Sequence, residues 1–371
     1  MHGTVLVIKN VQGLRFVAAA WVALFHLNFL FGHGTDVAWV NAVVGSGYAG
    51  VDVFFVISGY IMALTTAGRG PGAKSGALFL GQRFARIYSG WWPFFLLYLI
   101  YSAATGGPQP EVRLLPSFFL WPTLLPHHLV PIAWTLSFEL FFYVCTAAVL
   151  VWSRRNAWMV MLIWATIVVL LNSLWMAQGR YHPDKLAEVT FSQWFLFFPL
   201  ALEFIAGFVL HDFLRRHEPG RWIPWVMGAV LFALLIVVYQ QFGVFHPSGL
   251  AGLYHAPERA ILWGGFSVCL VAAAVRLESD GTTPARWAVA FGDASYSIYL
   301  GHILLIQLFL ILHSRFGSLA APKSLVFGVA FVALIAVLRV YYQWVERPLY
   351  GLVKKRISSL YGGLRLDQIP S

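Results

Sequence analysis

The sequence predicts an all-α integral membrane protein, built as a bundle of about ten transmembrane helices. Of its 371 residues, 59% are hydrophobic and only 11% are charged, and the mean hydropathy is +0.72. A soluble domain of this length cannot bury so much apolar surface. In addition, ten apolar segments approach bilayer length, and the loops between them alternate in positive charge.

The apolar segments can be placed in order along the chain. The first is too long for the apolar core of a cleavable signal peptide, so we expect it to remain as the first span. The third is short and follows an amphipathic approach. The predicted spans are about 11–31, 48–66, 87–104, 131–152, 157–176, 193–214, 222–241, 257–276, 287–312 and 323–345. We find no internal repeat, so we predict one membrane-embedded domain over 1–350 and a basic cytoplasmic tail over 351–371.

Loop charges orient this bundle. With a cytoplasmic N-terminus, 17 lysines and arginines fall on the cytoplasmic side and six on the outer side, with Arg15 and Arg339 left at helix ends. The opposite orientation inverts this bias, so the positive-inside rule predicts that both termini are cytoplasmic. The same rule accounts for the net charge of +10, so no nucleic-acid partner is predicted. The longest outer loops, about 105–130, 177–192 and 242–256, suit an acceptor-facing rim.

The first span carries two polar side chains on one face. Eleven residues separate Arg15 from His26, which is close to three helical turns and about 16 Å along the axis. A histidine deep in a membrane span is costly, and this makes His26 a functional candidate.

Three more ionisable residues are predicted in the outer half of the membrane, at the depth of His26. Asp52 lies near the outer start of the second span, and His302 lies in the outer half of the ninth. Glu139 lies about 12 Å from the outer end of the fourth span. Charged groups in lipid face the bundle interior, so we expect all four to line one cavity. There a histidine beside a carboxylate can accept a proton from a hydroxyl group.

Helical spacing extends two of these faces. One face carries Thr135, Glu139 and Tyr143, and the other carries Ser295, Tyr299 and His302.

A second group of polar residues lies at the cytoplasmic edge. Arg83 and Arg86 are one helical turn apart before the third span, and paired guanidinium groups suit phosphate. Arg15, at the inner end of the first span, could join them. The plain alternative is that Arg83 and Arg86 only set the topology.

Structural roles remain open for several buried polar residues. Glu139 could be a hydrogen-bond partner between helices, and we expect that role for Glu203. Asp52 could cap its helix or hold His26. Cys145 and Cys269 both fall inside apolar spans, so neither a structural disulfide nor a metal site is predicted.

In this order the motifs resemble the type-three membrane acyltransferases. These bacterial proteins O-acylate sugars of surface polysaccharides, lipopolysaccharide, nodulation factors and some antibiotics. The resemblance covers nearly the whole chain. It rests on Arg15 with His26, on Tyr48 with Asp52 in GYAGVDVFFVISGY, on Arg83 with Arg86, on Trp134 with Glu139 in WTLSFELFFY, on Tyr299 with His302 in SYSIYLGH, and on Glu346, Arg347 and Pro348 in VERPL. One departure is Pro93, which follows the arginine pair later than is usual in the family.

The resemblance implies a transmembrane O-acyltransferase of the bacterial cytoplasmic (inner) membrane. Its donor would be cytoplasmic acyl-CoA, with acetyl-CoA as the expected form, and no metal would take part. Its acceptor would be a glycan or a lipid-linked sugar at the outer face. The implied site residues are His26 as general base, Asp52 to orient it, Glu139 and His302 to position the acceptor or share the proton, Arg15, Arg83 and Arg86 to bind the donor, and Tyr48, Trp134, Tyr299 and Glu346 in support.

Two other interpretations stay open. A covalent acyl-histidine could carry the group in place of direct transfer. A transporter or flippase of a lipid-linked sugar would also place polar residues at mid-membrane, although it should show paired helix breaks in related halves, which we do not find in the sequence. The sequence specifies neither the acyl chain, nor the acceptor glycan, nor the oligomeric state.

Overall fold

The computed structural model describes residues 8–32, 38–152, 156–181, 185, 190–217, 220–242, 257–316 and 322–360. Across these residues the chain forms helices and turns without a β-strand. Nine helical segments within them are long and apolar enough to cross a membrane. The predicted all-α polytopic membrane fold is therefore confirmed. Most of the predicted outer loop 242–256 and the end of the predicted tail, 361–371, lie outside the described residues.

Eleven long helices make up the bundle in this part of the chain. They are α1 (Lys9–Phe31), α3 (Gly50–Thr66), α4 (Ala73–Ala104), α6 (Trp134–Trp152), α7 (Ala157–Ala177), α8 (Ala201–Arg216), α9 (Ile223–Phe242), α11 (Pro257–Ser279), α13 (Ser295–Phe316), α14 (Lys323–Tyr341) and α15 (Arg347–Leu360). Shorter pieces are the helices α2 (Ala38–Gly45), α5 (Leu114–Phe118) and α12 (Arg286–Asp293), the 3₁₀ turns Gly47–Ala49, Leu125–His127 and Pro131–Ala133, and the π-helical turns Ser192–Leu196 and Tyr342–Glu346.

Two of the nine membrane-length segments are longer than predicted, since Trp39–Thr66 begins before residue 48 and Lys323–Ile357 continues past residue 345. Nine of the ten predicted spans overlap these segments. The exception is the third, 87–104, which is helical within α4 but rich in Trp, Tyr, Ser and Gly and so less apolar. The ninth span begins later than the predicted residue 287. Ala294 has φ −85° and ψ 0°, which separates α12 from α13, so the span starts at Ser295. The predicted boundary between domain and tail falls inside α15, which packs against α4.

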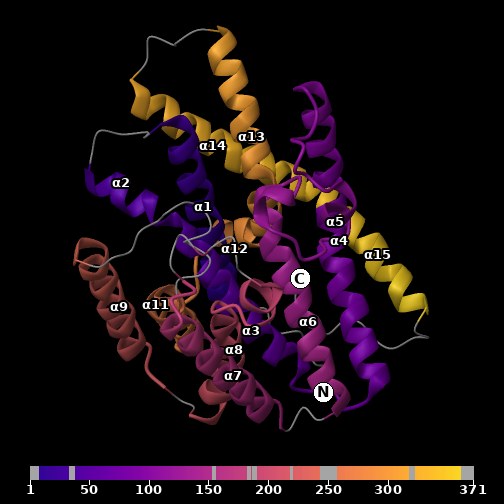
Figure 1. The fold of residues 1–371 in the computed structure, drawn as a ribbon, viewed down its shortest axis with the longest axis vertical. Helices are drawn as coiled ribbons and strands as arrows, with labels where there is room; N and C mark the ends of the chain where they lie inside the picture. The colour runs from indigo at the N-terminus through magenta and orange to yellow at the C-terminus, as the bar shows by residue number, and fades with distance from the viewer. Residues whose placement is uncertain are drawn as a thin grey trace.

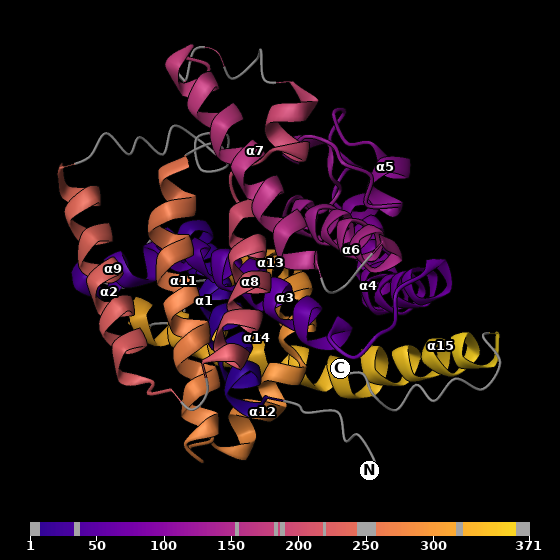
Figure 2. The same ribbon diagram turned by 90° about the horizontal axis from the view of Figure 1, so that it is seen from below.

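Helix α1 lies at the centre of the bundle (Figure 1). It packs against α3, α11, α12 and α13, and more lightly against α14. The view from below shows α15 running crosswise to α9 and α11 (Figure 2). Arg15 and His26 therefore both project from the helix with the most neighbours, so each can be reached by side chains of several spans.

The contact between α3 and α8 is the most extensive in the fold, and two glycines explain it. A Cβ atom on Gly59 would lie 1.9 Å from the carbonyl oxygen of Phe204, and one on Gly207 would lie 2.0 Å from that of Val56. Small residues of this kind let membrane helices approach backbone to backbone. No larger side chain fits at either position without separating the two helices.

The connection between α4 and α6 folds back along α4. The carbonyl oxygen of Phe118 accepts hydrogen bonds from the indole nitrogens of Trp91, at 3.2 Å, and Trp92, at 3.3 Å. The hydroxyl of Tyr88 donates to the carbonyl of Phe119 at 2.7 Å. The last carbonyl groups of a helix have no partner within it, and these side chains supply partners at the end of α5. Part of the predicted outer loop 105–130 thus packs beside the third span.

Candidate functional site

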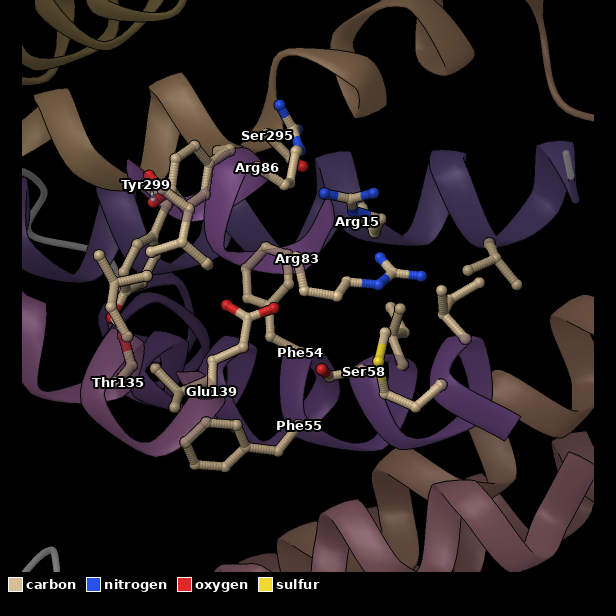
Figure 3. A pocket seen from close by; sticks show the side chains of 18 of the residues that line it. Arg15, Phe54, Phe55, Ser58, Arg83, Arg86, Thr135, Glu139, Ser295 and Tyr299 are labelled. Atoms are coloured by element: carbon tan, nitrogen blue, oxygen red, sulfur yellow. Dashed lines mark hydrogen bonds between the residues drawn. The ribbon is translucent and has the colours of Figure 1, made fainter. Parts of the chain in front are cut away.

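A cavity, called the arginine cavity below, lies between α1, α3, α4, α6 and α13. Figure 3 shows its lining: arginines gather at one end, and Thr135 and Tyr299 lie at the other. The polar part of the wall consists of Gln12, Arg15, Ser58, Arg83, Arg86, Thr135, Glu139, Tyr143, Ser295, Tyr296 and Tyr299. All three arginines predicted to bind the donor therefore line one space.

One of these arginines is neutralised by a carboxylate. Arg86 Nη1 lies 2.6 Å from Glu346 Oε1, and the Ser297 hydroxyl donates to the other Glu346 oxygen. The guanidinium also lies over the rings of Tyr296, at 5.4 Å, and Tyr350, at 5.3 Å. Glu346 comes from the π-helical turn after α14, so this ion pair ties that turn to α4.

The other two arginines have no such partner. Arg83 Nη2 donates to the Thr65 hydroxyl at 3.0 Å, and Arg15 Nη1 donates to Gln12 Oε1 at 3.4 Å. Among the described residues, no carboxylate lies within 4.0 Å of either guanidinium. Two positive charges therefore face the cavity unpaired, and an anionic ligand would neutralise them.

The predicted face of α6 lines the same cavity, so the spacing argument for Thr135, Glu139 and Tyr143 is confirmed. The Tyr143 hydroxyl donates to Glu139 Oε1. Thr135 and Tyr299 are joined by a hydrogen bond of 3.0 Å between their hydroxyls.

His26 and His302 form a hydrogen-bonded pair outside this cavity, with Nε2 of His302 3.1 Å from Nδ1 of His26. Contacts with backbone carbonyls show which ring nitrogens of the two histidines are protonated. Nδ1 of His302 lies 3.1 Å from the Ile298 carbonyl, and Nδ1 of His26 lies 3.0 Å from the Val22 carbonyl. A carbonyl only accepts, so both Nδ1 atoms carry the proton in neutral rings. Nε2 of His302 then accepts from His26, and Nε2 of His26 keeps a free lone pair.

Tyr299 lies between the cavity and the histidine pair. It lines the cavity, and its ring centre is 6.0 Å from that of His302 and 5.9 Å from that of Phe54. Its hydroxyl lies 3.2 Å from the carbonyl of Ile132, at the start of the fourth span. Neither histidine belongs to the cavity wall.

Asp52 has a partner that the sequence analysis did not identify. Arg259 binds it with two hydrogen bonds, Nε to Oδ1 at 2.9 Å and Nη2 to Oδ2 at 2.7 Å. The same guanidinium lies 5.1 Å from the centre of the Tyr48 ring. Glu203 of α8 interacts electrostatically with both Asp52 and Arg259. The only sequence signal was an arginine in the first turn of an apolar span, which we counted as a topology charge.

The four residues expected in one cavity are thus divided among three places. His26 meets His302, Asp52 is held by Arg259, and Glu139 lines the arginine cavity. The hydrogen bonds of His26 go to Val22 and His302, so the contact that orients its ring comes from His302 where we expected Asp52. Depth along the membrane was a poor guide to neighbours, because residues at one depth can project from opposite sides of the bundle.

Trp134 packs among aromatic rings. Its ring meets those of Phe55, Phe138 and Phe198 edge to face, with centres 6.2, 5.7 and 6.5 Å apart. This packing fixes the start of α6 and so supports the face that carries Glu139. Within the described part of the chain, no three His, Cys, Asp or Glu residues are arranged to hold a metal ion.

Comparisons with known proteins point to one family. A family model described as an acyltransferase domain matches residues 8–341. The exopolysaccharide production protein ExoZ of Rhizobium meliloti is 31% identical to this chain over 316 residues. The match covers 82% of this chain and 89% of the relative. No solved structure matches the chain.

Proposed function

This chain belongs to the acyltransferase-3 family of membrane proteins, and from that premise we propose that it O-acylates an exopolysaccharide or its lipid-linked precursor. The donor is acyl-CoA bound from the cytoplasmic side, and the group transferred is acetyl. The acceptor hydroxyl approaches from the outer side. The name of the relative ExoZ supports a surface polysaccharide as acceptor.

The observation that carries this proposal is the histidine pair. With its Nδ1 proton shared between the Val22 carbonyl and Nε2 of His302, His26 presents Nε2 as an unprotonated base. The same two acceptors stabilise the imidazolium that forms when Nε2 takes a proton. His302 is thus a positioning residue, and His26 is the group that meets the reacting atoms.

We propose the following reaction for this histidine pair. The acceptor hydroxyl gives its proton to His26 Nε2 while its oxygen attacks the carbonyl carbon of the thioester. The carbon–sulfur bond breaks, and the CoA thiolate leaves. The imidazolium then returns the proton to that sulfur, so the products are the sugar ester and free CoA.

We place the phosphates of the donor at the arginine end of the cavity, which lies opposite Tyr299. Arg15 and Arg83 face that space without carboxylate partners, and guanidinium groups bind phosphate strongly. The arm of CoA then extends toward Tyr299, which is the wall nearest the histidines. We place the thioester at this wall, where the Tyr299 ring lies 6.0 Å from that of His302.

An acyl-imidazole on His26 Nε2 is the competing intermediate. It would need the same free lone pair, with the Nδ1 proton passing to His302 as the acyl group is added. Rapid acid quench with labelled acetyl-CoA in the absence of acceptor distinguishes the two. Direct transfer predicts that no label stays on the protein.

The proposal is tested with purified protein in nanodiscs, given acetyl-CoA and glycan from a strain that lacks the gene. The measured quantities are acceptor-dependent CoA release and the acetyl content of the glycan. His26→Gln keeps the size and hydrogen bonding of the side chain but not its basicity, so transfer should fall at least about 100-fold. His217→Gln, at an exposed histidine, is the matched control. Near wild-type transfer by His26→Gln would remove His26 from the mechanism.

A further inference from the structure

Glu139 lies halfway along the cavity. On α6 it is one turn from Tyr143, whose ring lies 5.8 Å from the Arg83 guanidinium. It is also one turn from Thr135, which is bonded to Tyr299. At 1.5 Å per residue, each of these steps is about 6 Å. Figure 3 shows the carboxylate pointing into the cavity, between the arginine side and the Tyr299 side.

The carboxylate has acceptor capacity to spare at this point. Its Oε1 accepts a hydrogen bond from the Tyr143 hydroxyl, and among the described residues neither Arg15 nor Arg83 lies within ion-pair distance of it. An ionised carboxylate can only accept hydrogen bonds. A partly buried one with a free oxygen therefore attracts an N–H or O–H donor and repels an anion. It does not suit the phosphates that the arginines attract.

We propose that Glu139 binds the pantetheine arm of the donor by accepting a hydrogen bond from one of its amide N–H groups. This rests on the proposed function, since it assumes that acyl-CoA occupies the cavity. Along that molecule the order is phosphates, two secondary amides, then the thioester. Along the cavity the order is Arg15 and Arg83, then Glu139, then Tyr299. The two sequences of chemical groups match in the same direction.

This assignment changes the role of Glu139 from the one expected from its depth. A carboxylate that accepts a hydrogen bond from an amide of the donor contributes to donor affinity and helps to place the thioester. The proton of the acceptor hydroxyl passes instead to His26. It also selects the class of donor. An acyl phosphate has the anion but no amide, so it leaves the Glu139 oxygen without a partner.

The test compares two ligands that differ in the arm. One is CoA, and the other is 3′-phosphoadenosine 5′-diphosphate, which keeps the nucleotide and all three phosphates but lacks pantetheine. For Glu139→Ala, calorimetric titration of the purified protein should show CoA affinity reduced at least about tenfold, as for a lost hydrogen bond to a charged group. Affinity for 3′-phosphoadenosine 5′-diphosphate should stay unchanged. Arg83→Ala, the matched control, should weaken both ligands. Glu139→Gln, which keeps an acceptor oxygen without the charge, should fall between wild type and Glu139→Ala.

Two outcomes would overturn the inference. Equal loss of both ligands in Glu139→Ala and Glu139→Gln would make the residue a structural support. Wild-type CoA affinity together with lost transfer would make it a proton-transfer residue. If the wild-type protein binds neither ligand, the acyl-CoA donor of the proposed function fails instead, so the two failures are distinguishable.

Discussion

Two regions of the molecule each bury an arginine–carboxylate pair, and one of them borders the arginine cavity. Arg86 and Glu346 lie 2.6 Å apart with side chains 13% and 0% exposed. Arg259 and Asp52 lie 2.7 Å apart with side chains 3% and 0% exposed. The contacts are almost the same, and both tie together helices that are distant in the sequence.

The surroundings of the two pairs differ in the sign of the excess charge. Beside Arg86 are Arg15 and Arg83, which have no carboxylate partner and face open space. Beside Asp52 is a second carboxyl group, Glu203, which is 1% exposed. A buried ion pair alone is therefore weak support for a functional site. Unpaired charge of one sign next to a cavity is the stronger indication.

Breaking the pair of Arg259 and Asp52 should have the largest effect on stability. Arg259→Ala leaves Asp52 buried without its cation, so we expect a loss of stability of about 3–5 kcal/mol. The measurement is the thermal transition of the protein in detergent, together with the amount of folded protein in the membrane. Arg286→Ala, at an exposed arginine, is the control and should behave as wild type. If Arg259→Ala also melts like wild type, the pair does not hold α3 to α11.

The cavity arginines should separate into two kinds. Arg83→Ala should weaken CoA binding about tenfold or more, as for a charge-assisted hydrogen bond, and leave the thermal transition near that of wild type. Arg86→Ala strands the buried Glu346, so it should lower stability as well. Titration calorimetry and melting curves on both variants test this difference. Identical behaviour of the two would contradict our distinction between a free and a paired guanidinium.

The histidine pair provides a finer comparison, between a base and the residue that orients it. His302→Gln keeps an oxygen that can accept from His26 Nδ1, whereas His302→Leu cannot accept. We expect His302→Leu to lose about tenfold in transfer rate, the equivalent of one hydrogen bond, and His302→Gln to retain more activity. Acetyl-CoA binding should not change in either variant. Complete loss in both would instead make His302 the base.

Much of the fold followed from composition and periodicity. Nine spans were predicted at nearly their observed positions, because bilayer length is a strong constraint on a single helix. Helical spacing also placed Thr135, Glu139 and Tyr143 on one face, since that relation lies within one element. The meeting of His26 with His302 agrees with the expected topology, in which both were predicted in the outer half of outward-running spans.

Relations between elements were harder to predict. Nothing in the sequence distinguishes Arg259 from an arginine that sets topology, because its partner Asp52 lies 207 residues away. The fold of the segment after α4 was also missed, since hydropathy alone assigns a polar, proline-containing connection to the outside. Spacing and hydropathy give side and depth on each helix, whereas packing decides which helix lies opposite.

The smallest effect on stability is expected for the neutral hydrogen bond between Thr135 and Tyr299, on the cavity wall nearest His302. The hydroxyls of Thr135 and Tyr299 lie 3.0 Å apart, and both also lie near the Ile132 carbonyl, at 3.0 and 3.2 Å. Tyr299→Phe keeps the ring and removes this link, so it should cost about 1 kcal/mol. Thr135→Val should cost a similar amount.

Because the two side chains share one hydrogen bond, the double variant should cost less than the sum of the single ones. Unfolding measurements on all four proteins give this coupling energy. If the losses are instead additive, the bond does not couple α6 to α13, and the wall between the cavity and His302 is held by ring packing alone.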